Sequence, residues 1–146
     1  MTVLLDTNVI MDAIQERHPF DVTAKEILER SQNGELSCLF TANAATDIFY
    51  LYSKARDIKS AKIVLKFLLE NYGVISATHE DCTNALSIPI DDFEDALAIA
   101  CAQKANIEYV VTRDDKLLSC DLPIKIISPT KLLELIPLAE VQEFFD

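Results

Sequence analysis

The stretch from Val3 to Met11 constrains the fold more than any other, because two apolar runs enclose the polar triplet Asp6-Thr7-Asn8. A short apolar run without alternation is typical of a strand buried on both faces, as in a parallel sheet. Asp6 therefore falls at the carboxyl end of the first strand, where open α/β sheets bind ligands. The alternative is that Asp6 only caps the following helix, since Asp, Thr and Asn all favour that position.

The composition indicates one folded domain, which we place at residues 1–146. The chain has 146 residues, of which 50% are hydrophobic, enough for a single core. No apolar run approaches the ~20 residues of a membrane span, and the N-terminus lacks the basic region of a secretory signal. We therefore expect a cytoplasmic protein without membrane contact. Its four cysteines lack zinc-ligand spacing and are expected to be free thiols.

The net charge of -11 restricts the kinds of partner. A protein that binds nucleic acid through a broad basic surface carries the opposite sign. The acidic charge suits a protein that gathers cations or docks a basic partner. The chain has only two glycines and no GxGxxG or Walker pattern, which argues against a phosphate-binding loop.

The hydrophobic pattern predicts strands that alternate with helices. Strands are expected at residues 3–5, 37–40, 74–76, 109–112 and 124–127. Helices are expected at residues 9–15, 21–32, 42–54, 60–71, 78–88, 91–104 and from 129 onward. This alternation predicts a parallel sheet with helices on both faces. The acidic tail, residues 138–146, is expected either to pack back as a helix or to form part of an interface.

Three acids have positions that suggest a shared site. Asp6 and Asp114 each follow a buried strand, so their carboxylates converge if those two strands are neighbours. Asp47 borders the apolar stripe of the third predicted helix, and is expected to face the protein body. The alternative for Asp47 is a partly buried acid that a hydroxyl such as that of Thr46 satisfies.

The fourth acid, Asp95, lies near the start of the sixth predicted helix, with Asp92 three residues earlier on the same face. Acids at a helix N-terminus are favoured by the helix dipole. That explanation suffices for Asp91 and Glu94. It explains Asp95 less well, because Asp95 borders the apolar part of this helix, and we therefore assign Asp95 to the site.

Carboxylates that gather in one cleft repel each other unless a cation offsets their charge. Hard oxygen ligands of this kind suit Mg²⁺ or Mn²⁺. Such a site can generate hydroxide and stabilise an in-line displacement at phosphorus. The two histidines, His18 beside a proline and His79 at a helix start, offer little basis for a Ser-His-Asp or Cys-His triad.

Four segments carry a resemblance to a known family, and they are Leu4–Val9, Thr41–Leu51, Asp92–Ala100 and Val111–Asp114. In order and spacing they resemble the PIN-domain family, in particular its small single-domain nucleases of the VapC toxin type. The resemblance implies an α/β fold built as a three-layer α/β/α sandwich with a central parallel sheet. It also implies metal-dependent cleavage of RNA.

The resemblance assigns roles to individual residues. Those implied to be catalytic and metal-binding are Asp6, Asp47, Asp95 and Asp114. Those implied to support them are Thr7, Asn8, Asp92 and Thr112. The implied cofactor is Mg²⁺ or Mn²⁺. The acid of the third helix is often Glu in this family, and the shorter Asp47 stands there in this chain.

Basic residues cluster around the turn between the third and fourth predicted helices. The possible RNA contacts are Lys54, Arg56 and Lys59 in this cluster, and Arg113 beside Asp114. The alternative is that the cluster is simply a solvated helical face.

The sequence is thus interpreted as a Mg²⁺- or Mn²⁺-dependent endoribonuclease, the toxin half of a toxin–antitoxin pair. The family resemblance implies attack by water that leaves a 5′-phosphate and a 3′-hydroxyl, an antitoxin partner that blocks the acidic cleft, and a homodimer. One alternative is a non-catalytic PIN-like module that binds a protein partner. A phosphotransferase of the haloacid-dehalogenase type would need a second Asp at the position of Asn8.

Overall fold

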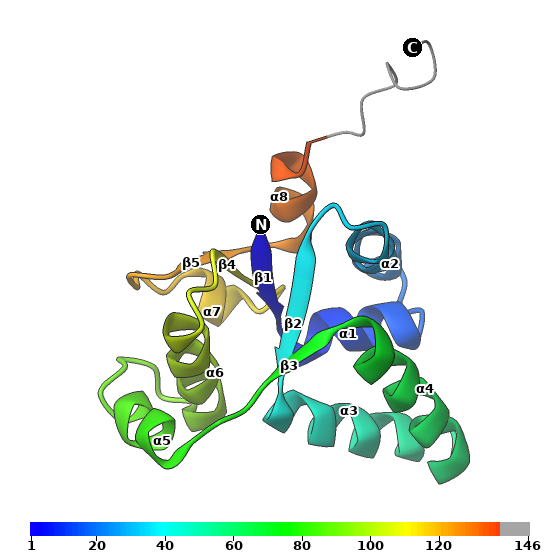
Figure 1. Ribbon diagram of the computed structural model, residues 1–146, viewed down its shortest axis with the longest axis horizontal. Helices are drawn as coiled ribbons and strands as arrows, with labels where there is room; N and C mark the ends of the chain where they lie inside the picture. Colours follow the sequence, from blue (N-terminus) through cyan, green and yellow to red (C-terminus); the bar gives the residue numbers. More distant parts are fainter. Residues whose placement is uncertain (138–146) are drawn as a thin grey trace.

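A computed structural model describes residues 1–137, and these form a parallel five-stranded sheet between two layers of helices (Figure 1). The strands are β1 (Thr2–Leu5), β2 (Ser37–Thr41), β3 (Gly73–Ile75), β4 (Tyr109–Val111) and β5 (Lys125–Ile127). The helices are α1 (Thr7–Ile14), α2 (Asp21–Gln32), α3 (Ala42–Ala55), α4 (Ile58–Asn71), α5 (His79–Ala85), α6 (Phe93–Lys104), α7 (Asp115–Leu118) and α8 (Pro129–Leu135).

Strand β1 lies in the middle of the sheet, whose order is β3-β2-β1-β4-β5. The chain builds outward from β1 in one direction through β2 and β3, then returns to its other side with β4 and β5. Leu5 of β1 pairs with Val111 of β4, and the Asp6 amide donates to the Val111 carbonyl at 2.9 Å. The two strands at the reversal of strand order therefore end together, which is where such sheets bind ligands.

Successive side chains of β1 pack into two hydrophobic cores, one on each face of the sheet, as expected when a strand is buried on both faces. Val3 and Leu5 pack with α1, α2, α3, α4 and α8, whereas Leu4 packs with α5, α6 and α7. Helices α5 and α6 accordingly lie on one side of the sheet in Figure 1, and α1 to α4 on the other. This arrangement confirms the predicted three-layer α/β/α sandwich.

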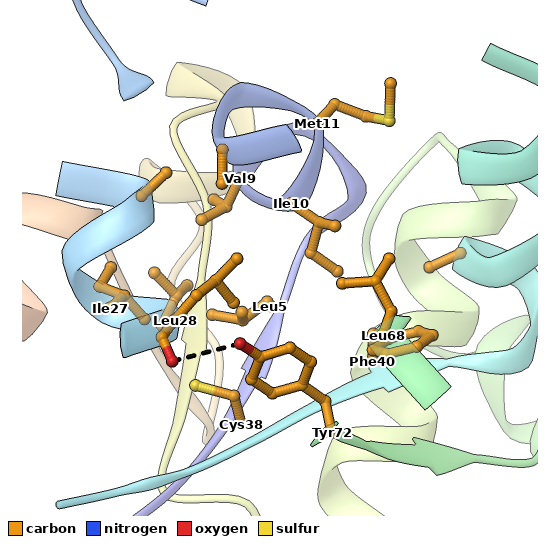
Figure 2. Packing of buried hydrophobic residues seen from close by; sticks show 14 of the residues in the cluster. Leu5, Val9, Ile10, Met11, Ile27, Leu28, Cys38, Phe40, Leu68 and Tyr72 are labelled. Carbon is orange, nitrogen blue, oxygen red and sulfur yellow. Dashed lines mark hydrogen bonds between the residues drawn. The ribbon is translucent and has the colours of Figure 1, made fainter. Parts of the chain in front are cut away.

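In the hydrophobic core between the sheet and helices α1 to α4, a buried tyrosine hydroxyl joins two helical segments by a hydrogen bond. Tyr72, at the C-cap of α4, donates its phenolic proton to the Leu28 carbonyl of α2 at 3.2 Å, as Figure 2 shows. Burial raises the pKa of the Tyr72 phenol to about 12. Cys38 and Phe40 of β2 pack in the same core, and all four cysteines of the chain are free.

The strand predictions are confirmed to within a residue or two, but some helix boundaries differ. Helix α4 begins at Ile58, two residues early, because Asp57 accepts hydrogen bonds from the backbone and hydroxyl of Ser60. Helix α5 ends at Ala85, before Pro89 as predicted. The short helix α7 was not predicted.

Two further expectations concern the chain as a whole. Residues 138–146, for which a helix or an interface segment was expected, lie outside the described residues. Across the described part of the chain, every helix is too short or too polar to span a bilayer.

Candidate active site

Asp6 is held at the carboxyl end of β1 by three hydrogen bonds. The Thr7 backbone amide donates to Oδ1 at 2.8 Å, and Oδ2 accepts from the Asn8 amide at 3.0 Å and the Thr112 hydroxyl at 2.8 Å. Asp6 is also the N-cap of α1, so the same side chain both caps this helix and lies at the carboxyl end of β1. Thr7 contributes its backbone N–H to this arrangement, and Asn8 and Thr112 contribute side chains.

Thr112 connects Asp6 to the next acid along the sheet edge. Its hydroxyl is fully buried, donates to Asp6, and accepts from the Asp114 backbone amide at 3.0 Å. Asp114 in turn caps α7 by accepting from the Lys116 amide at 3.0 Å. Burial raises the pKa of the Asp6 carboxyl, and the charge of Asp114 adds to this, against the hydrogen bonds from Thr112 and Thr7.

Asp95 approaches the same place from α6. Asp92 is the N-cap of this helix and accepts from the Asp95 amide at 3.0 Å, which fixes the first turn. The pKa of Asp95 is raised to about 6, first by burial and then by the charges of Asp92, Asp6 and Asp114. Three acids from different segments therefore act electrostatically on Asp95.

Asp47 of α3 faces the start of α6, where its partner is Glu94. The pKa of Glu94 is raised to about 7, chiefly by a side-chain hydrogen bond with Asp47, then by partial burial and by the charges of Asp47, Asp92 and Asp95. Glu94 was not predicted from the sequence, since the helix dipole accounts for an acid at this position. Thr46 bonds the Asn43 carbonyl, so it does not satisfy Asp47.

All four predicted acids line one open cavity of about 300 Å³, which we call the acidic cleft. Its lining residues are Asp6, Thr7, Asn8, Met11, Arg17, Asp47, Leu51, Asp92, Glu94, Asp95 and Asp114. The cleft lies where β1 and β4 end and α1, α3 and α6 begin or pass. Six carboxylates in this small volume form a strongly negative site.

Arg113, one of the predicted RNA contacts, forms an ion pair within the protein. Its guanidinium donates to both oxygens of the Asp12 carboxylate, at 2.6 and 3.0 Å, and lies 4.2 Å from the centre of the Phe20 ring. Asp12 is 1% exposed. Asp12 raises the pKa of Arg113, and this pair fastens the segment after β4 to α1.

A second cation, Arg17, lies beside this pair and was not predicted from the sequence. Its guanidinium is 3.9 Å from Asp12 and lines the acidic cleft. Arg17 also lines an adjoining cavity of about 220 Å³ that includes Arg56, one of the predicted RNA contacts. Lys54 and Lys59, the other two in that cluster, are exposed on α3 and α4, with Lys54 4.8 Å from the Tyr50 ring.

The chemistry of the cleft fits a hard divalent cation. Within residues 1–137, no three Asp, Glu, His or Cys side chains are arranged to hold one metal ion as they stand. The donor set nevertheless consists of carboxylates, which such ions prefer. The pKa of Asp95 is raised by burial and then by the neighbouring acids, and that of Glu94 by its hydrogen bond with Asp47, by burial and by the same charges. A bound cation would relieve the repulsive part of these shifts. The side-chain oxygen of Asn8, next to Asp6, is buried without a hydrogen-bond partner.

The fold and site together define an α/β protein with an acidic cleft at the switch point of its sheet. A family model described as PIN domain matches residues 2–116. The chain belongs to the PIN-domain family.

Relatives of known sequence or structure agree with this assignment. The chain is 27% identical over 124 residues to "Ribonuclease VapC23" of Mycobacterium tuberculosis, covering 80% of this chain and 96% of that protein. A DNA-bound VapBC structure from Salmonella typhimurium matches with a TM-score of 0.69 and 14% identity, over 88% of this chain and 98% of that one. VapC20 of M. tuberculosis, described as a sarcin-ricin loop cleaving toxin, matches with a TM-score of 0.65 and 16% identity, over 79% and 92%.

Proposed function

We propose that this chain is a metal-dependent endoribonuclease and the toxin of a toxin–antitoxin pair. The observation that carries the proposal is the acidic cleft, where Asp6, Asp47, Asp95 and Asp114 meet from four segments of a PIN domain. The ribonuclease relative VapC23 supports the reaction and the substrate class.

Mg²⁺ or Mn²⁺ would be held by carboxylates of the acidic cleft, and these are Asp6, Asp47, Asp95 and Asp114. A bound ion of this kind supplies a water of lowered pKa and offsets the charge of the scissile phosphate. Thr112 and Asn8 orient Asp6, since they hold one of its oxygens from two sides. The Asp114 amide is held in turn by Thr112, so one buried hydroxyl positions two acids.

Glu94 and Asp47 provide a place to hold a proton near neutral pH. The hydrogen bond with Asp47, partial burial and the neighbouring acids raise the pKa of Glu94 to about 7, so its carboxyl keeps the proton of their shared hydrogen bond at a pH where a free glutamate has released it. A carboxyl with this pKa is suited to general acid–base work at physiological pH. We assign to Glu94 the delivery of a proton to the leaving 3′-oxygen, which agrees with the expected 5′-phosphate and 3′-hydroxyl ends.

The antitoxin partner is proposed from charge and from the relatives. Solved neighbours include a toxin–antitoxin complex from Klebsiella pneumoniae and VapBC structures. A chain with a net charge of -11 and a cleft of carboxylates attracts a basic segment of a partner protein. The hairpin of α3 and α4 exposes Ile63 and Phe67, at 62% and 45%, which suits an apolar contact with the antitoxin or with a second copy in a homodimer.

The decisive experiment measures cleavage of RNA by the purified chain with and without Mn²⁺, and identifies the new ends by mass spectrometry. We expect 5′-phosphate and 3′-hydroxyl ends that require the metal. Asp47→Asn should abolish cleavage, and Asp115→Asn, an exposed acid next to Asp114, should retain it. Equal activity of wild type and Asp47→Asn would overturn the proposal.

A further inference from the structure

A second cavity, of about 460 Å³, opens directly beside the acidic cleft. Asp92, Asp95 and Asp114 line both cavities. The other lining residues come from the loop before α6, from α7 and from the segment just after α7, and they are Pro89, Ile90, Asp91, Lys116, Leu117 and Cys120. We call this cavity the flanking pocket. The proposed ribonuclease function assigns no role to the flanking pocket.

The position of the flanking pocket links it to the proposed substrate. Because the two cavities share three side chains, a nucleotide next to a phosphate held in the acidic cleft would reach the mouth of the flanking pocket. The volume of the flanking pocket lies in the range of roughly 300–1,000 Å³ that is usual for small-ligand sites. It is also larger than the cleft itself, at about 460 against 300 Å³.

The lining of the flanking pocket suits a planar base with polar edges. Ile90, which is half-buried, offers apolar surface against which the face of a ring can pack, and the 4%-exposed Leu117 completes the apolar part of the wall. Lys116 offers a donor of the kind that pairs with a ring carbonyl, as lysine does with guanine. Asp91 offers an acceptor of the kind that pairs with an exocyclic amine, as acidic side chains do with cytosine.

We propose that the flanking pocket binds the base next to the scissile phosphate and prefers a base with both an exocyclic amine and a ring carbonyl. Guanine and cytosine meet this requirement. Uracil lacks the amine, and adenine lacks the carbonyl. This inference rests on the proposed ribonuclease function, to which it adds a specificity-determining subsite with Lys116 and Asp91 as its polar contacts.

The first test uses matched short RNAs that differ only at one position beside the cleavage site. Guanine or cytosine there should be cleaved roughly tenfold faster than an abasic residue, the effect of one stacked and bonded base, and faster than adenine or uracil. Lys116→Ala should remove most of this preference. Lys125→Ala, an exposed lysine at the start of β5 and so at the opposite end of the strands from the cleft, should keep it.

The second test needs no catalysis, because Cys120 lies in the pocket wall. The Asp47→Asn variant is mixed with RNA in Mg²⁺, and alkylation of Cys120 by iodoacetamide is followed by peptide mass spectrometry. Cys82 of α5, also half-buried, is the internal reference. Guanine-containing RNA should slow alkylation of Cys120 relative to Cys82 several-fold, and the matched abasic RNA should not.

The outcomes separate this inference from the proposed function. An enzyme that cleaves RNA without regard to the neighbouring base, with Cys120 alkylated at an unchanged rate, overturns the subsite and leaves the ribonuclease standing. Guanine-dependent protection of Cys120, together with a wild-type chain that cleaves no RNA, overturns the nuclease and supports the subsite.

Discussion

The Arg113 guanidinium donates two hydrogen bonds to the buried Asp12 carboxylate, and this pair connects the segment after β4 to α1. The Asp12 side chain is 2% exposed, and its next cation, Arg17, is 3.9 Å away. Removing Arg113 leaves a buried charge poorly paired, which is strongly destabilising. We predict that Arg113→Ala lowers the free energy of unfolding by about 3 kcal/mol, as measured by urea denaturation at pH 7.

The double variant Asp12→Ala with Arg113→Ala is the matched control, since it leaves no orphaned charge. It should recover part of the lost stability. If Arg113→Ala is instead as stable as wild type while its RNA affinity falls, then Arg113 is an RNA contact, as the sequence predicted, and not a structural pair.

The raised pKa of Asp95 makes a prediction about the metal-free protein. Its carboxyl has a pKa of about 6 in the native state, against 3.8 ordinarily. The native state therefore keeps a proton that the unfolded chain has released, so Asp95 destabilises the fold as pH rises from about 4 to above 6. We predict that Asp95→Asn is more stable than wild type at pH 7, by about 1 kcal/mol after solvent screening, with no gain at pH 3.

A bound divalent metal ion should make the wild type more stable than Asp95→Asn at pH 7. An ion that binds only the native state stabilises it by roughly 2.7 kcal/mol at a hundred times Kd. Added Mn²⁺ is expected to raise the Tm of the wild type and of Asp115→Asn, but not that of Asp95→Asn, which also loses RNA cleavage. A metal-induced rise of the same size in all three proteins would show that Asp95 does not take part in the site.

The Glu94 carboxyl should titrate near pH 7 in the metal-free protein, as seen by NMR of its side-chain carbon. We predict that Glu94→Gln reduces RNA cleavage at least tenfold, while Glu26→Gln on the distant face of α2 has no effect. Titration of Glu94 near its ordinary value of 4.5 would contradict the proton-holding role.

Arg17 and Arg56 offer a path for the RNA backbone out of the acidic cleft, because Arg17 lines both the cleft and the cavity next to Arg56. Each phosphate contact that is lost should reduce the dependence of log Kd on log salt by about 0.7 for single-stranded RNA. We predict this reduction for Arg17→Ala and for Arg56→Ala, in titrations by fluorescence anisotropy. Lys131→Ala on α8 is the control, and an unchanged slope in all three would leave the basic cluster as a solvated face.

Much of the fold was predictable because a parallel sheet requires unbroken apolar strands separated by helices. The run Val3-Leu4-Leu5 could be recognised as a doubly buried strand from its residues alone. Its place in the middle of the sheet could not, because strand order depends on pairing with β2 and β4, more than thirty and a hundred residues away. Helix α7 was missed because four residues are too few to show a helical period.

The site was predictable where an acid follows a buried strand or borders an apolar stripe, as Asp6 and Asp47 do. Glu94 could not be found in this way, since an exposed acid in the first turn of a helix has an adequate local explanation. Glu94 has a hydrogen-bond partner only because the fold brings Asp47 of α3 next to it. Arg17 was missed for a similar reason, because it follows the end of α1 in a polar turn.

The central place of β1 has a consequence for synthesis of this protein in a cell. Asp6 is made 106 residues before Thr112, whose hydroxyl orients it, and Asp114 follows two residues later. The cleft therefore cannot be completed until β4 has been translated and has paired with β1. A chain that ends before residue 112 therefore lacks the assembled acidic cleft, whatever the fold of its remaining residues.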